Sequence, residues 1–178
     1  MTVLRPFRPR HAFAALALVL AAGAGQAAGL DIHADADAKD VGLPIYPGAV
    51  KRAEPGSDSH SGAFSFGVWG ESFGFKLAVV SYRSTDGVDA VARFYRDALA
   101  QYGPVLDCTG VHGKHEKHEK HDDKADSDKA VTCDGDSVAP GGRLFKVGIN
   151  RAQRVFEVKP AGDGSTFTLV RIEMHGTD

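Results

Sequence analysis

The chain has few cysteines, few aromatic residues beyond phenylalanine, and no excess of basic residues. Its 178 residues include two cysteines, one tryptophan, 21 Lys and Arg and 23 Asp and Glu. No stretch forms a basic stripe, which argues against a nucleic-acid-binding protein. No glycine-rich phosphate loop, Cys-x-x-Cys pair or haem attachment motif is present either. The sequence therefore indicates no resident cofactor apart from a candidate transition metal.

Long apolar runs are also scarce, because the chain contains only one, at residues 12–25. It follows three arginines between positions 5 and 10 and is shorter than the roughly 20 residues that a transmembrane helix needs. Small residues after it suit cleavage near Ala27, so we expect a Sec-type signal peptide over residues 1–27 and a periplasmic or secreted protein. A retained N-terminal anchor is the alternative. We expect no transmembrane segment after the signal peptide is removed.

Residues 28–42 are polar and rich in alanine, and four aspartates recur in them. Spaced aspartates can indicate a calcium loop, but the glycine and the terminal glutamate of an EF-hand are missing. We therefore expect a flexible acidic leader. Residues 43–178 are long enough for a single domain with its own core, and a His-rich loop insertion is expected at residues 110–130.

The clearest element is a helix that begins at Thr85 and ends at Tyr102. Its apolar positions are spaced three and four residues apart, as one buried stripe requires. They are Val88, Val91, Ala92, Tyr95, Leu99 and Tyr102. Thr85 or Ser84 is the expected N-cap, and Gly103 followed by Pro104 is a stop signal. We expect no second comparable helix.

The residue pattern in the rest of the domain predicts strands. We expect them at residues 64–69, 75–82, 105–108, 130–133, 144–149, 155–159 and 166–174, with residues 43–50 at the first edge of the sheet. Residues 130–133 are the expected partner of residues 105–108. The expected fold is α+β, an antiparallel sheet of about six to seven strands packed by a single central helix. A parallel doubly wound sheet would need several crossover helices.

Two cysteines, Cys108 and Cys133, lie in this domain. In an exported protein a single pair is most simply a disulfide. The chain-entropy model gives at most about 3.5 kcal/mol of stabilisation for a ring of this length. The alternative is a pair of thiolate ligands in a metal site.

The stretch between the cysteines repeats a Lys-His-Glu triplet and places a histidine at every third position. The candidate metal ligands in it are His112, His115, His118, His121, Asp122 and Asp123. Imidazole and carboxylate bind zinc, nickel and copper, and such binding should weaken below about pH 6.5, where imidazole is protonated. A solvated low-complexity loop with no specific metal site is the alternative.

Residues 70–74 match the Gly-x-Ser-x-Gly pattern of serine hydrolases around Ser72. That motif requires a sharp turn from a strand into a helix, and here a strand is expected to follow. The pattern therefore predicts a hairpin loop, and we expect no catalytic residue. His60 and His175 are isolated histidines that could join a triad only through the tertiary fold.

Two aromatic residues, Trp69 and Phe73, flank this hairpin. An aromatic hairpin tip can contact a ligand or a partner, but a place in the core is the more common role. Phe94 and Tyr95 in the helix are expected at the edge and in the interior of the core.

The Leu-Pro-Ile-Tyr-Pro-Gly-Ala segment at residues 43–49, followed by Phe-Tyr-Arg-Asp-Ala-Leu at residues 94–99, resembles small exported bacterial domains of unassigned function. In these domains a Tyr-Pro-Gly-Ala element precedes strands and a helix with a Phe-Tyr pair. The resemblance covers most of residues 43–174 and implies an extracytoplasmic α+β domain. It brings no activity and no catalytic residues, and it does not include the His-rich insert.

The leading functional hypothesis from the sequence is a non-enzymatic exported bacterial protein whose His-rich loop binds a divalent transition metal. The alternative is a cell-envelope binding module for a protein or small ligand, which would use its sheet face or its aromatic hairpin. An enzyme is the third hypothesis. The sequence does not identify a partner or an oligomeric state.

Overall fold

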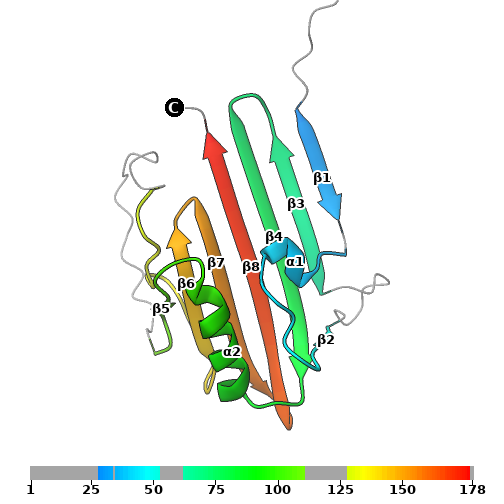
Figure 1. Ribbon diagram of the computed structural model, residues 1–178, viewed down its shortest axis with the longest axis vertical. Coiled ribbons are helices and arrows are strands. Elements are labelled where there is room, and N and C mark those ends of the chain that lie inside the picture. Colours follow the sequence, from blue (N-terminus) through cyan, green and yellow to red (C-terminus); the bar gives the residue numbers. More distant parts are fainter. Residues whose placement is uncertain (1–27, 34, 53–61, 111–127, 177–178) are drawn as a thin grey trace, which may run out of the picture.

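A single antiparallel sheet of eight strands, with two helices on one of its faces, makes up the described part of the chain (Figure 1). The computed structural model describes residues 28–33, 35–52, 62–110 and 128–176. The strand order is β1-β3-β4-β8-β7-β6-β5, and β2 pairs with β4. The fold is therefore α+β, as the sequence predicts.

The strands of the sheet differ greatly in length. They are β1 (Gly29–His33), β2 (Val50–Lys51), β3 (Ala63–Trp69), β4 (Phe73–Ser84), β5 (Leu106–Asp107), β6 (Arg143–Ile149), β7 (Ala152–Ala161) and β8 (Gly164–Gly176). The helices are α1 (Ala38–Val41) and α2 (Val88–Ala100). Strands β4 and β8 lie side by side along the whole of β4 and form the centre of the sheet.

Two described strands, β1 and β2, were not among the expected strands. The segment 43–50, expected at the first edge of the sheet, contributes only Val50 to β2, and β1 forms the edge beside β3. The expected pairing of residues 130–133 with 105–108 was also wrong. Strand β5 pairs with β6 instead, and Ala130 forms only an isolated bridge to Ile149. A two-residue strand carries too little periodicity to specify its partner.

Helix α2 is shorter than expected at both ends. Gly87 is its N-cap and provides no side-chain hydrogen bond. The Ser84 hydroxyl instead accepts a hydrogen bond from Asp86 N at 3.0 Å, so it stabilises the turn before the helix. The helix packs on β6, β7 and β8 rather than over the centre of the sheet, and a second helix, α1, packs on β4 and β8. The single central helix was therefore a wrong prediction.

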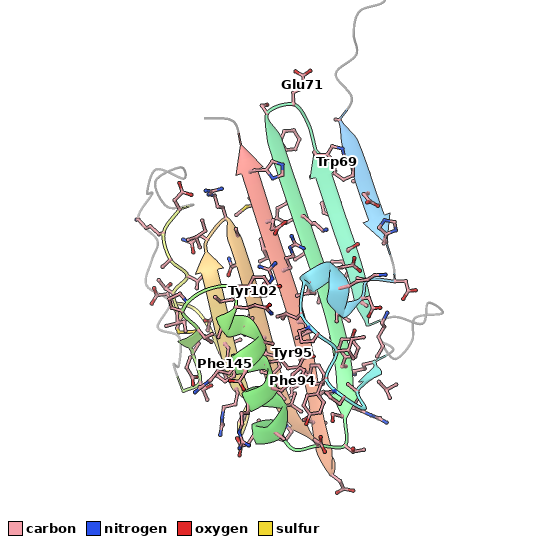
Figure 2. The ribbon with its side chains drawn as sticks, in the orientation of Figure 1. Trp69, Glu71, Phe94, Tyr95, Tyr102 and Phe145 are labelled. Carbon is pink, nitrogen blue, oxygen red and sulfur yellow. A yellow bond between two sulfur atoms is a disulfide. The ribbon has the colours of Figure 1, made fainter. Side chains whose placement is uncertain are left out.

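The core lies between the helices and the face of the sheet that they cover. Its larger members are Val41, Leu43, Tyr46, Val80, Tyr82, Val91, Tyr95, Leu99, Phe145, Val147, Phe156, Val158, Phe167 and Leu169. Tyr95 is fully buried at its centre, where its ring stacks on Phe156 at 4.7 Å and meets Phe167 at 5.2 Å (Figure 2). Phe94 packs at the edge of this core, so the roles expected for both helix aromatics are confirmed.

Residues 28–42 form two ordered elements, β1 and α1, where a flexible leader was expected. Asp37 and Asp40 form a capping box at the start of α1, and Gly42 ends it with a φ of +79°. Ala36, Ala38 and Val41 are buried in the core. The segment folds because its few apolar side chains reach a core formed by distant residues, which its polar composition does not reveal.

Candidate ligand-binding groove

The helices leave one end of the sheet uncovered on their own side, and a groove of about 580 Å³ lies there. The strands β1, β3, β4 and β8 form its floor, beside the hairpin that joins β3 to β4. Figure 2 shows Trp69 at this end of β3, next to β1. The groove therefore combines side chains from segments more than 100 residues apart.

Two aromatic rings lie over glycines in the outermost cross-strand row. The register places Gly29, Trp69, Gly74 and His175 side by side on four adjacent strands. A Cβ atom at position 29 would overlap the indole of Trp69, and one at position 74 would overlap the imidazole of His175. Because both neighbours are glycines, each ring can lie across the backbone of the next strand.

The next cross-strand row carries charges of both signs around a third glycine. It contains Asp31, Gly67, Lys76 and Glu173, again on four adjacent strands. A Cβ atom at Gly67 would lie 3.1 Å from Cζ3 of Trp69, so the indole also covers this glycine. Gly67 thus leaves room for the indole between a carboxylate on β1 and an ammonium group on β4.

Most of the charged groups in the groove already have partners. His33 Nε2 lies 2.6 Å from Asp31 Oδ1, and Arg171 Nε donates to Glu173 Oε1 at 2.7 Å. Lys76 forms no ion pair with any residue that the structure describes. Its ammonium group is therefore available to a ligand.

The inner end of the groove is closed by α1, whose Asp40 contributes to the lining. Three donors hold the C-terminal carbonyls of this short helix. Arg171 donates to Asp40 O at 3.3 Å, Arg154 Nε donates to Val41 O at 2.9 Å, and the Tyr102 hydroxyl donates to Gly42 O. These bonds satisfy carbonyls that a four-residue helix cannot pair internally, so this wall of the groove is fixed.

At the start of α1, a buried tyrosine stabilises the N-cap. The Tyr82 hydroxyl donates to Asp37 Oδ1 at 2.9 Å and accepts from Ala38 N at 3.2 Å. This hydrogen bond from Tyr82 is the main cause that lowers the pKa of Asp37 below its ordinary value of 3.8. Burial and the neighbouring Asp37 raise the pKa of Tyr82, so its hydroxyl stays protonated and remains a donor.

The aromatic residues at the hairpin are exposed, which corrects the expectation that they belong to the core. Trp69 is 45% exposed and Phe73 is 49% exposed. The loop around Ser72 joins β3 directly to β4, so it is the predicted hairpin and not the strand-to-helix turn of a serine hydrolase. The core-facing positions of this hairpin are Ala63, Ala78 and Val80, further from the turn.

The two cysteines form a disulfide, with Cα atoms 5.3 Å apart. Cys108, Cys133 and Asp136 are the only residues of the described part of the chain with the spacing of a metal-ligand group. Because the two sulfur atoms are bonded to each other, they are not thiolate ligands, and the alternative of a cysteine metal site is excluded. Asp136 instead pairs with Lys146 at 2.7 Å.

The six residues predicted as metal ligands, His112, His115, His118, His121, Asp122 and Asp123, lie outside the described residues, as does His60. Of the other residues considered from the sequence, Trp69 and His175 both line the groove. Sequence reasoning missed Lys76 and Glu173. The available signal was alternation, because each stands between two apolar residues in a predicted strand and must point to the opposite face.

Comparisons with protein-family models, curated proteins and solved structures found no match to this chain. Its described helices, α1 and α2, are both too short and too polar to cross a membrane. The fold and the groove define the chain as an α+β domain with one partly covered sheet, and its function has to be inferred from its own surfaces.

Proposed function

We propose that this protein is a non-enzymatic binding module of the bacterial cell envelope that binds a neutral oligosaccharide in the groove. The observation that carries the proposal is the Trp69 indole, which lies across glycines with part of its surface exposed, next to hydrogen-bonding groups of both signs. A sugar ring has C–H groups on its faces and hydroxyls around its edge. It therefore matches an aromatic surface bordered by donors and acceptors.

The polar groups support a neutral ligand with many hydroxyls. Asp31 and Glu173 accept hydrogen bonds, whereas Lys76 donates them. Each carboxylate already has a partner, the His33 imidazole for Asp31 and the Arg171 guanidinium for Glu173, so part of its hydrogen-bonding capacity is already used. The groove is lined both by carboxylates and by the Lys76 ammonium group, so an ionic ligand of either sign would also meet charges of its own sign.

The size and shape of the groove fit a few sugar units. Its volume of about 580 Å³ lies within the range of about 300–1,000 Å³ typical of small-ligand sites. Because the groove is not enclosed, a bound chain can extend beyond it. An open site with a single aromatic surface predicts modest affinity, with a Kd of about 0.1–1 mM.

The experiment uses Trp69 itself as the reporter, because it is the only tryptophan in the chain. Maltotriose, cellotriose and tri-N-acetylchitotriose are titrated into the protein while indole fluorescence is recorded, with trigalacturonate as the anionic comparator. We expect a saturable emission change with at least one neutral trisaccharide, weaker binding of trigalacturonate, and no cleavage of the sugar. The absence of an emission change with all three neutral sugars at 10 mM (about tenfold above the weakest expected Kd) would contradict the proposal.

Three variants locate the site, with binding followed by calorimetry. Trp69→Ala should weaken binding at least about tenfold, and Lys76→Met about threefold to tenfold through one lost hydrogen bond. Gly67→Val should displace the Trp69 indole, which lies over this glycine, while the strand is retained because valine favours strands. Lys159→Met is the matched control, since Lys159 is exposed on β7 outside the groove, and it should leave affinity unchanged. Equal losses in Lys76→Met and Lys159→Met would contradict the assigned site.

A further inference from the structure

The face of the sheet opposite the helices carries a continuous apolar surface, which we call the open apolar face. It consists of three cross-strand rows on β1, β3, β4, β8 and β7. The rows are Leu30, Val68, Phe75 and Met174; then Ile32, Phe66, Leu77 and Ile172; then Phe64, Val79, Val170 and Val155. In Figure 1 the helices lie on the near side of the sheet, so this face is turned away from the viewer.

None of these twelve side chains is buried. Leu30 and Ile32 are each 64% exposed, Phe64 is 45% exposed and Met174 is 40% exposed, and the other eight are half-buried by their neighbours in the sheet. Both described helices and the hydrophobic core lie on the opposite side. The apolar surface is therefore covered by no described element.

At the end of the sheet that holds the groove, the distribution of side chains is the reverse of that expected for a sheet with one solvated face. An antiparallel sheet usually turns its polar positions to water and its apolar positions to the core. Here Lys76 and Glu173 lie on the helix side, whereas Phe75, Leu77 and Ile172 face outward. Leaving so much apolar surface in water is unfavourable, which indicates that another surface covers it.

We propose that a second copy of this chain covers the open apolar face, so that two sheets pack face to face as a symmetric sandwich. The twelve side chains together expose on the order of 600 Å², given about 150–250 Å² for a fully exposed aromatic side chain. Two copies would then bury roughly 1,200 Å², the lower end of the range for specific interfaces. The area suffices for a dimer without help from another partner.

Charge also favours a second copy over an unlike protein. A symmetric interface places the same patch against itself, so a charged patch would repel its own copy. The open apolar face contains no charged side chain among its twelve members. The first charged residues lie at its margin, at Lys146 on β6 and Glu157 on β7. An uncharged surface is compatible with its own copy and offers no charge to specify another protein.

The dimer is independent of the sugar-binding proposal. The groove lies on the helix side of the sheet, so both grooves of the dimer would face outward and stay accessible. A dimer would then present two binding sites, and a chain of repeated sugars could engage both.

Sedimentation of the purified full chain between about 1 and 200 µM tests the dimer, because an interface of this size predicts a micromolar Kd. We expect a monomer–dimer equilibrium in this range. Ile32→Lys places a charge on the apolar face and should weaken the dimer at least about tenfold. Ile45→Lys is the matched control, since Ile45 is 50% exposed and lies outside the open apolar face, and it should dimerise as the original chain does.

A cross-linking measurement covers the case in which Ile32→Lys fails to fold. Benzoylphenylalanine in place of Phe64 should give a cross-linked dimer on irradiation, whereas the same substitution at Ile45 should not. A monomer at 200 µM, or equal cross-linking from both positions, would overturn the proposal. Sugar titration through Trp69 in the Ile32→Lys monomer separates the two proposals, because it should be unchanged even where dimerisation is lost.

Discussion

The hydroxyl of Tyr95 joins the helix to the segment that leads from α1 to β2, and its removal is the sharpest test of how the core is organised. This hydroxyl accepts a hydrogen bond from Tyr46 N at 3.2 Å and donates one to Pro44 O at 3.1 Å. Burial raises the pKa of Tyr95, so the hydroxyl remains protonated and can donate throughout the physiological pH range. Tyr95→Phe removes only this oxygen and keeps the ring on Phe156.

The cost follows from the two backbone groups that lose their partner. A buried polar group left without a hydrogen bond costs about 1–3 kcal/mol. Tyr95 is fully buried and Tyr46 is 9% exposed, so water can replace the lost bonds only in part. We expect Tyr95→Phe to lower the free energy of unfolding by about 3 kcal/mol. For a domain of this size that corresponds to a fall in Tm of roughly 6–12 °C.

Urea unfolding followed by circular dichroism gives the free energy directly, and calorimetry gives Tm. Tyr102→Phe is the matched control, because the Tyr102 hydroxyl also donates to a backbone carbonyl but the side chain is 37% exposed. Water can satisfy the freed carbonyl of Gly42, so the control should lose less than about 1 kcal/mol. A loss below about 0.5 kcal/mol in Tyr95→Phe would refute the reasoning, since it would mean that neither backbone group depends on the hydroxyl.

Three further predictions concern stability and metal binding. Replacing both Cys108 and Cys133 with serine should lower the free energy of unfolding by about 2–3.5 kcal/mol, measured by urea unfolding; an unchanged midpoint would contradict it. Because the pKa of Asp37 is lowered in the folded state, its stabilising effect is present above its unfolded value and lost as pH falls through the folded pKa, below about pH 4. Tyr82→Phe should reduce that loss of stability in acid unfolding curves, and an identical pH profile would argue against it. Calorimetry with zinc, nickel and copper should give saturable heat that weakens below about pH 6.5 and disappears when residues 112–124 are deleted; no heat at micromolar protein would refute specific binding.

Local sequence signals predicted the elements with strong periodicity and failed where a segment folds only against distant residues. The stripe around Tyr95 and the alternation in β4 and β8 were sufficient to place α2 and the long strands. The 28–42 segment was assigned to a flexible leader because its composition is polar. Its capping aspartate and its glycine at position 42 were local signals of α1, but β1 depends on pairing with β3, which lies more than 30 residues away.

The candidate groove could be predicted only in part. Trp69 was recognised as a candidate contact at an aromatic hairpin, and its exposure depends on where the helices end on the sheet. Asp31 was noted only as one of several spaced aspartates. Its place opposite Gly67, which separates it from Lys76, follows from strand register, which the sequence of β1 alone does not specify.

The sequence by itself determined the α+β class, the helix that carries Tyr95, the last three strands β6, β7 and β8, and the pairing of the only two cysteines. The fold class, the helix and the strands depend on local periodicity, and the disulfide depends on the presence of just two cysteines. The tertiary structure alone decided which face of the sheet the helices cover. Alternation shows that Phe75, Leu77 and Val79 share a face, but it cannot show whether that face meets a helix. The helices pack on the Ala78 and Val80 side, because the Tyr95 ring of α2 packs there on Phe156 and Phe167 of the sheet. Because the helices cover this face, the groove and the open apolar face lie on opposite sides of one sheet.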